Sequence, residues 1–140
     1  MQLRVTRRTD LASRALVSLS NGGGRRKASD LADELDASAG FLTQALTPVV
    51  AKGWIRSDPG PTGGYTSVVP LDAITVLELV EAVEGGTDVT TCVLQDRPCA
   101  GGGRCALHDA WARARTNLLS ELAATPLSAV ADRPGLAIGR

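Results

Sequence analysis

The sequence predicts a mostly α-helical fold that contains one two-stranded hairpin. Three segments before residue 53 repeat apolar residues at helical spacing, and two more follow residue 74. Between them, the turn-rich stretch DPGPTGG separates two short runs of β-forming residues. With 140 residues, 44% of them apolar and 3% aromatic, the chain is long enough for one folded unit with an aliphatic core.

The first helix is expected over residues 9–20, because apolar residues share one face there until the breaker NGGG. A short second helix should follow the basic run RRK, with Ser29 as its N-cap and an end near Asp36. Ser38 is placed to cap a third helix, which Gly53 should end.

Two short strands are expected next, WIRS at 54–57 and YTSVV at 65–69. Three helices followed by a hairpin is the order of a winged helix-turn-helix, in which the third helix enters the major groove of DNA. Pro48 lies inside that third helix and should kink it, because proline removes one backbone hydrogen bond.

The fourth helix has a clear start at Thr75 and Glu78, which form a T-x-x-E capping box. It should cover residues 76–84 and end at two glycines. A long last helix carries an apolar stripe made of Leu107, Trp111, Ala114, Leu118 and Leu122. The stripe could cover the core of its own chain, but we expect it to join two chains in a homodimer.

These elements divide the chain into three parts. Residues 1–72 would form the winged helix-turn-helix, a DNA-binding region, and residues 73–125 would hold a cysteine-rich loop and the dimerisation helices. Residues 126–140, where the composition turns to Pro, Gly, Ala and Ser, would form a flexible tail.

Basic and acidic residues are unevenly distributed, although fifteen of each leave no net charge. Residues 1–70 hold nine basic and six acidic residues, whereas residues 71–140 hold six and nine. The front half is therefore basic and the back half acidic. The sequence contains no apolar stretch long enough to span a bilayer and no secretory signal, so we expect a cytoplasmic protein without membrane contact.

All three cysteines and the only histidine lie in one segment, TTCVLQDRPCAGGGRCALHDA at 90–110. A structural disulfide is not expected in a reducing compartment, and an odd count would leave one thiol over. The spacing C-x6-C-x5-C-x2-H is neither the C-x-x-C of thiol oxidoreductases nor the paired knuckle of structural zinc sites. Widely spaced cysteines around three glycines can wrap a group larger than one ion, and an iron-sulfur cluster meets that requirement.

Several of these features together resemble one protein family. TDLASRALVSL near the start, the helix-turn-helix, GPTGGY in the wing, ITVLELVEAVEG after it and three cysteines before a long helix are similar to the iron-sulfur transcription regulators that include IscR and NsrR, the Rrf-two family. The similarity extends over about residues 3–124 and is closest to the NsrR pattern. It implies that Cys92, Cys99 and Cys105 are the thiolate ligands of one cluster in each subunit of a homodimer.

The resemblance offers two candidates for the fourth ligand. Asp10 of the partner subunit stands at the position that completes a four-iron cluster in NsrR-like proteins, and His108 at the position that completes a two-iron cluster in IscR-like proteins. We favour Asp10 and a four-iron cluster, because the two-iron type lacks a matching aspartate, whereas a histidine at this position can occur without binding a cluster. A hard carboxylate on a soft cluster should exchange easily and so give nitric oxide or oxygen a place to attack. Asp10 could instead serve only the dipole of its helix, and His108 could be an ordinary surface residue.

The DNA partner would be a palindromic double-stranded operator. A glutamine on the third helix can pair with adenine, hydroxyls can meet phosphates or base edges, and the basic run before the second helix should meet phosphates or form a solvated face. The candidate DNA-contacting residues are Arg25, Arg26, Lys27, Ser38, Thr43, Gln44, Gly63, Gly64 and Tyr65. Pro59 and Gly60 stand where the family has Arg-Gly in the wing, so an arginine contact in the minor groove is not expected there.

We expect the cluster-loaded form to bind DNA and repress, and nitrosylation or oxidation to lift repression. One alternative is a winged-helix regulator with structural zinc in a Cys3His site, and another is a redox switch that forms disulfides without metal. A thiol redox enzyme or a cluster carrier would need a C-x-x-C motif or a catalytic constellation, which the sequence lacks, so we predict that the chain is not an enzyme.

Overall fold

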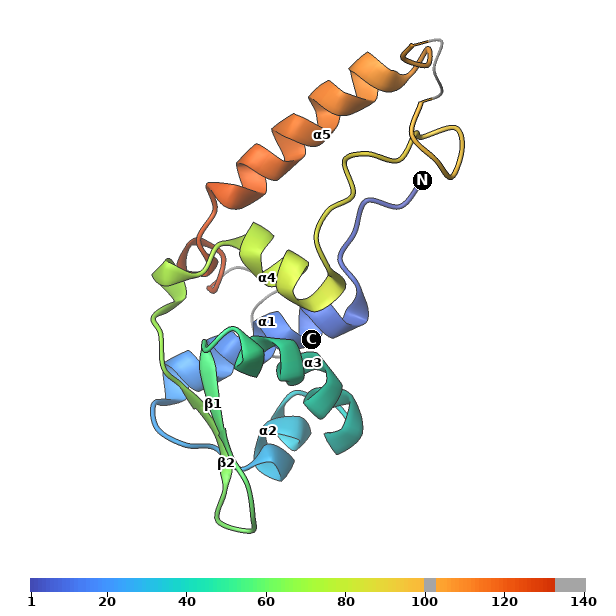
Figure 1. The fold of residues 1–140 in the computed structure, drawn as a ribbon. Coiled ribbons are helices and arrows are strands. Elements are labelled where there is room, and N and C mark those ends of the chain that lie inside the picture. Colours follow the sequence, from blue (N-terminus) through green and yellow to red (C-terminus); the bar gives the residue numbers. More distant parts are fainter. Residues whose placement is uncertain (100–102, 133–140) are drawn as a thin grey trace.

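The computed structural model describes residues 1–99 and 103–132, and it has the predicted mostly helical winged-helix architecture (Figure 1). The elements in chain order are α1 (Arg7–Gly22), α2 (Ala28–Glu34), α3 (Ala39–Ala51), β1 (Ile55–Asp58), β2 (Gly64–Ser67), the 3-10 helix η1 (Leu71–Ala73), α4 (Val76–Glu84), α5 (His108–Ala123) and the 3-10 helix η2 (Leu127–Ala129). Among the described residues, no helix is both long and apolar enough to cross a membrane.

Helix α1 is the centre of the core and packs against α3, α4 and β2. Its leucines Leu11, Leu16 and Leu19 are at most 1% exposed. The helix begins earlier than predicted because the hydroxyl of Thr6 accepts a hydrogen bond from the amide of Thr9 and so caps it. Figure 1 shows α2 and α3 on the side of α1 that faces away from α5.

The start of α2 differs from the prediction. The N-cap is Lys27, which makes no side-chain cap bond, and Ser29 lies inside the first turn. The backbone of Arg26 exchanges two hydrogen bonds with Tyr65, of 2.9 and 2.8 Å, and this bridge keeps the chain extended up to Lys27. Pairing with the wing, rather than a serine cap, therefore determines where the helix begins.

Helix α3 begins as predicted, since the hydroxyl of Ser38 accepts from the amide of Phe41 at 3.1 Å. Pro48 lies inside a single helix that continues to Ala51, so the proline does not divide the element. The apolar face of α3 is fully buried at Leu42 and Leu46, which packs the helix onto α1.

The wing is an antiparallel pair in which Ile55 faces Ser67 and Asp58 faces Gly64. The first residue of β2, position 64, needs to be glycine. The φ angle there is 145°, and a Cβ would lie 2.0 Å from the carbonyl oxygen of Arg26. Gly64 thus allows the backbone of the wing to approach the segment before α2.

Helix α4 has the predicted capping box: the hydroxyl of Thr75 accepts from the amide of Glu78 at 3.1 Å, and the Glu78 carboxylate accepts from the amide of Thr75 at 2.8 Å. The helix ends at Glu84, before Gly85 with φ 94°. Its bounds are those predicted from the sequence.

The segment predicted to be a flexible tail from residue 126 is packed at its start. The amide of Leu127 donates to the carbonyl of Ile74 at 2.8 Å, and the Leu127 side chain is 1% exposed. Burial of this leucine beside the start of α4 extends the fold beyond the predicted boundary. The remainder of the predicted tail, 133–140, lies outside the described residues.

Helix α5 extends away from the rest of the chain (Figure 1) and has no buried residue along its length. Trp111 and Leu118 of the predicted stripe are 37% and 45% exposed. The stripe therefore does not cover the core of its own chain, and dimerisation through it remains a prediction.

Candidate metal centre and nucleic-acid interface

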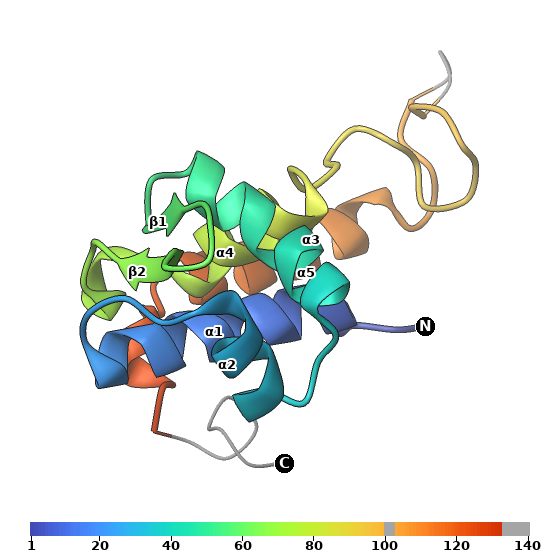
Figure 2. The same ribbon diagram turned by 90° about the horizontal axis from the view of Figure 1, so that it is seen from below.

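The three cysteines come together in the loop between α4 and α5. Their Sγ atoms all lie within 4.8 Å of one another, although the residues are spread over fourteen positions of the sequence. Cys92 is buried, and Cys99 and Cys105 are half-buried. Both ribbon views show that this loop extends away from the helical head (Figures 1 and 2). The thiols thus form one compact donor set in a segment outside the main core.

Local hydrogen bonds shape the approach to Cys92. One carboxylate oxygen of Asp88 accepts from the amides of Thr90 and Thr91 at 2.8 and 3.1 Å and from the Thr90 hydroxyl at 3.0 Å. Hydrogen bonds from Thr91 and Thr90 hold the pKa of Asp88 well below its usual value, so the Asp88 side chain in this turn is an ionised carboxylate. The amide of Cys92 then donates to the carbonyl of Arg97 at 2.9 Å, which closes the loop.

The cysteine thiols differ in their electrostatic surroundings. The amide of Leu94 donates to Sγ of Cys92 at 3.4 Å, and this bond lowers the pKa of Cys92. Burial raises the pKa of Cys105, because desolvation disfavours its thiolate. Cys92 is therefore the better prepared of the two to act as a thiolate ligand.

His108 lies beside the thiols, as the first residue of α5. Its Nδ1 is 3.5 Å from Sγ of Cys99, and its amide donates to the carbonyl of Cys105 at 3.1 Å. Within the described chain, the donor set in which every ligand atom lies within 4.8 Å of the others contains only the three cysteines. The structure thus places His108 next to the set without including it, and does not bring Asp10 of the same chain to it.

Asp10 lies in the first turn of α1 and forms an ion pair with Arg14 of the same helix. Its Oδ2 is 3.3 Å from Nε of Arg14, and the two side chains are 18% and 15% exposed. Nη1 of Arg14 also donates to the carbonyl of Leu35 at 3.3 Å, just before the turn between α2 and α3. The spacing of four residues between Asp10 and Arg14 is the sequence signal for this pair, and sequence reasoning did not use it.

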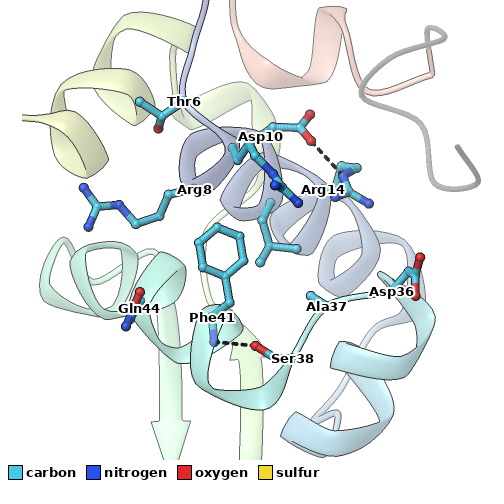
Figure 3. Close-up of a pocket in the computed structure, with 11 residues that line it drawn as sticks. Thr6, Arg8, Asp10, Arg14, Asp36, Ala37, Ser38, Phe41 and Gln44 are labelled. Carbon is cyan, nitrogen blue, oxygen red and sulfur yellow. Dashed lines mark hydrogen bonds and ion pairs between the residues drawn. The ribbon is translucent and has the colours of Figure 1, made fainter.

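A hollow of about 820 Å³ lies between the start of α1 and the start of α3 (Figure 3). The ring of Phe41 points into it from α3, while Asp10 and Arg14 lie on its α1 side. Gln44 lines the same hollow from the next turn of α3. Asp10 and the polar front of α3 therefore border one space.

The predicted DNA-facing residues of α3 are all exposed, but their polar groups differ in availability. The hydroxyl of Ser38 caps the helix, and that of Thr43 donates to the carbonyl of Ala39 at 3.0 Å. In the part of the chain that the structure describes, no hydrogen bond engages the amide of Gln44. Of the predicted contact residues on α3, Gln44 is therefore the one whose side-chain polar group stays unengaged within the described chain.

The basic run before α2 does not act as one surface. The guanidinium of Arg26 pairs with Glu34 at 2.7 Å and donates to the hydroxyl of Ser18 at 3.3 Å. The Ser18 hydroxyl and Arg26 together lower the pKa of Glu34. The ion pair between Arg26 and Glu34 is thus supported by the hydrogen bond from Ser18. Arg26 thus stabilises the head, whereas Arg25 and Lys27 are exposed and available for phosphates.

The predicted wing residues shape the hairpin more than they present groups to DNA. Tyr65 is 8% exposed and belongs to the core, and a Cβ on Gly63 would lie 2.0 Å from the carbonyl oxygen of Asp58. The exposed cation of the wing is Arg56, whose Nε lies 3.4 Å from Oδ2 of Asp58. Sequence reasoning missed Arg56 because the family pattern places the wing arginine nearer the tip.

The comparisons with known proteins agree with this architecture. The chain is 28% identical over 95 residues to an HTH-type transcriptional regulator of Haemophilus influenzae, which covers 68% of this chain and 63% of that protein. It is 30% identical over 82 residues to the HTH-type transcriptional regulator IscR of Vibrio cholerae, which covers 59% and 47%. The match thus spans less than two thirds of each of these relatives.

The fold is also that of a solved regulator. CymR, the global cysteine regulator of B. subtilis, superposes with a TM-score of 0.72 at 21% identity, over 93% of this chain and 97% of that chain. A family model described as an iron-dependent transcriptional regulator matches residues 5–133. Because that match includes the head, the cysteine loop and α5, the chain belongs to the Rrf2 family of transcriptional regulators.

Proposed function

We propose that this regulator is a cytoplasmic, homodimeric repressor, not an enzyme, whose affinity for a palindromic operator is controlled by an iron-sulfur cluster. The observation that carries the proposal is the convergence of three thiols within 4.8 Å in a loop of an iron-dependent regulator family. A bound iron-sulfur cluster would supply a group that reacts with nitric oxide or oxygen. Cys92, Cys99 and Cys105 would hold it.

The donor set suits this chemistry, but the loop must open to receive a cluster. Two thiolates on one tetrahedral ion with bonds of about 2.3 Å lie roughly 3.8 Å apart, whereas thiolates on different iron atoms lie farther apart. Thiols within 4.8 Å are thus closer together than a cluster requires. Their position in a loop outside the core allows that spreading at little cost in core packing.

We favour Asp10 of the partner subunit as the fourth ligand, with His108 as the alternative. Asp10 is attractive because of what its carboxylate touches in this chain: Arg14 binds it, and Arg14 also donates to Leu35. A carboxylate engaged by a neighbouring subunit would change the position of Arg14, and with it the turn that leads to α3. His108 would need less movement to join the thiols, because its Nδ1 already lies 3.5 Å from Sγ of Cys99.

DNA binding would use the exposed groups of the head. Gln44 would read a base in the major groove, with Ser38 and Thr43 beside it at the groove edge. Arg25 and Lys27, which precede α2, would neutralise phosphates beside the recognition helix. Pairing of two α5 stripes would set the spacing of two heads on a palindrome.

A zinc site is the second candidate, and two observations favour it. The thiol separations are compatible with one tetrahedral ion, and His108 beside Cys99 offers a fourth donor of the kind that structural zinc uses. A zinc site would stabilise the loop without a response to nitric oxide.

The deciding experiment is purification without oxygen, followed by a visible spectrum and counts of iron, acid-labile sulfide and zinc per chain. A coloured protein that contains iron and sulfide, and whose operator affinity falls on exposure to nitric oxide, supports the proposal. A colourless protein with one zinc per chain, or equal affinity with and without the cluster, refutes it.

The same measurements on Asp10→Ala and His108→Ala assign the fourth ligand. We expect Asp10→Ala to lose or alter the cluster spectrum and His108→Ala to retain it. The reverse result would assign the site to His108, and unchanged spectra in both variants would exclude both residues.

A further inference from the structure

Glu84, the last residue of α4, forms hydrogen bonds with the start of α1. One carboxylate oxygen of Glu84 accepts from the amide of Thr6 at 3.1 Å, from the Thr6 hydroxyl at 3.3 Å, and from the Thr9 hydroxyl. Beside them, Nη2 of Arg8 donates to the carbonyl of Val83 at 3.4 Å. Segments more than 70 positions apart in the sequence thus meet at one acidic group.

Each partner in this contact has a reason to bind a carboxylate. Thr6 is the N-cap of α1, and the start of a helix attracts negative charge. Thr9 is only 2% exposed, so its hydroxyl requires an acceptor inside the protein. A charged acceptor makes stronger hydrogen bonds than a neutral one, which suits Glu84 to hold both threonines at once.

The position of the contact gives it a role. Asp10 is the next residue after Thr9 in the first turn of α1. Glu84 is followed by Gly85, where φ is 94° and the chain leaves the helix toward Cys92. Through its hydrogen bonds, the Glu84 carboxylate therefore connects the end of α4, where the cysteine loop begins, to the turn of α1 that contains Asp10.

We propose that Glu84 is a positioning residue that transmits the state of the cysteine loop to the start of α1. This inference rests on the proposed function for its regulatory consequence. Loss of the Glu84 contact removes the bonds from Thr6 and Thr9 and loosens the first turn of α1 from α4. Asp10, Arg14 and the turn after Leu35 then no longer follow movements of the loop.

Stability alone does not account for the contact. Two of its three hydrogen bonds are at the surface, where a polar contact adds little to the free energy of unfolding. Helix α4 is already capped at its other end by Thr75 and Glu78, and it is anchored by the buried Leu79. The contact adds a fixed relation between two segments that otherwise meet through apolar packing and the bond from Arg8 to Val83.

The test compares Glu84→Ala with Glu78→Ala in the full-length protein. Both variants remove a glutamate that accepts hydrogen bonds at one end of α4, but only Glu84 contacts α1. The measurement is the operator affinity of cluster-loaded protein divided by that of cluster-free protein. Allosteric factors are typically about 5–150.

We expect Glu84→Ala to bring this ratio within about twofold of one, far below such typical factors. Glu78→Ala should keep the ratio of the unaltered protein, even if it lowers the melting temperature more. Glu84→Gln should restore part of the ratio, because the amide oxygen still accepts hydrogen bonds. An unaltered ratio in a cluster-loaded Glu84→Ala protein overturns the inference.

A second readout needs no cluster and no DNA. Amide hydrogen exchange at Thr9 and Asp10 reports opening of the first turn of α1, where both amides bond to Thr6. Exchange there should be faster in cluster-free Glu84→Ala than in Glu78→Ala. Equal exchange in these two variants would show that the Glu84 contact does not hold the first turn of α1. If the unaltered protein holds no cluster, the proposed function fails, while the exchange data still decide whether Glu84 positions α1.

Discussion

Arg14 holds the carboxylate of Asp10 at the start of α1, with Nε 3.3 Å from Oδ2 in a largely buried ion pair. The same guanidinium donates to the carbonyl of Leu35, next to Asp36 with its left-handed φ of 53°. One side chain thus contacts both the favoured cluster ligand and the turn of the helix-turn-helix. A change at Arg14 should therefore affect stability and DNA control together.

Arg14→Gln should lower the free energy of unfolding by roughly 1–3 kcal/mol, because it removes the cation of a mostly buried ion pair. Urea unfolding of the cluster-free protein measures this effect. The variant should also bring the operator affinities of cluster-loaded and cluster-free protein closer together, since the connection from Asp10 to Leu35 is lost.

Arg104→Gln is the control for Arg14. It breaks a pair with Asp109 at 2.9 Å, but the two side chains are 71% and 61% exposed, so we expect little change in stability. If Arg14→Gln proves as stable as Arg104→Gln and keeps full cluster dependence, the contact with Asp10 plays no part in either property.

The wing contains a carboxylate beside its exposed cation. Asp58→Asn should free Arg56, whose side chain is 61% exposed, and tighten operator binding severalfold at low salt. The affinity should also fall more steeply with salt, by a slope of about one, because one more cation reaches the phosphates. Asp72→Asn, an exposed change on the same head but outside the wing, should leave the salt slope unaltered. Equal slopes in Asp58→Asn and the unaltered protein would show that Arg56 does not reach DNA.

Two glycines offer a matched test of the wing geometry. Gly64→Ala places a Cβ 2.0 Å from the carbonyl oxygen of Arg26 at a φ of 145°, and should cost roughly 1–3 kcal/mol of stability. Gly40→Ala in α3 meets nothing within 4 Å and should stabilise the helix by up to about 1 kcal/mol. Thermal unfolding measures both variants. Similar melting temperatures would mean that the wing shifts away from Arg26 without cost.

The sequence was most informative where one local signal decides an element. The capping box at Thr75 and Glu78 and the glycines after residue 84 determined the bounds of α4, and Ser38 determined the start of α3. Ser29 failed as a cap because a nonlocal bridge between Arg26 and Tyr65 sets the start of α2. Propensity cannot report a pairing partner that lies 39 positions away in the chain.

The candidate site shows the same difference between local signals, which the sequence reveals, and nonlocal contacts, which it does not. The spacing of the cysteines indicated that they act together, and their thiols do converge. The sequence could not indicate that Arg26 forms an ion pair with Glu34, or that Glu84 accepts a hydrogen bond from Thr9, because both contacts depend on tertiary packing. The basic run in the sequence before α2 was therefore a poor guide to which of its residues are available for DNA.

The unburied stripe of α5 leads to the last prediction, that α5 mediates dimerisation. Leu118→Glu places a charge on the stripe, where Leu118 is 45% exposed in the single chain, and should convert a dimer to a monomer in sedimentation experiments. Thr116→Glu places the same charge on the opposite side of α5 and should leave the dimer intact. Because the monomer presents one head, Leu118→Glu should also lose most of its affinity for a full palindrome but little for a half-site. A Leu118→Glu protein that sediments as a dimer would assign dimerisation to another surface.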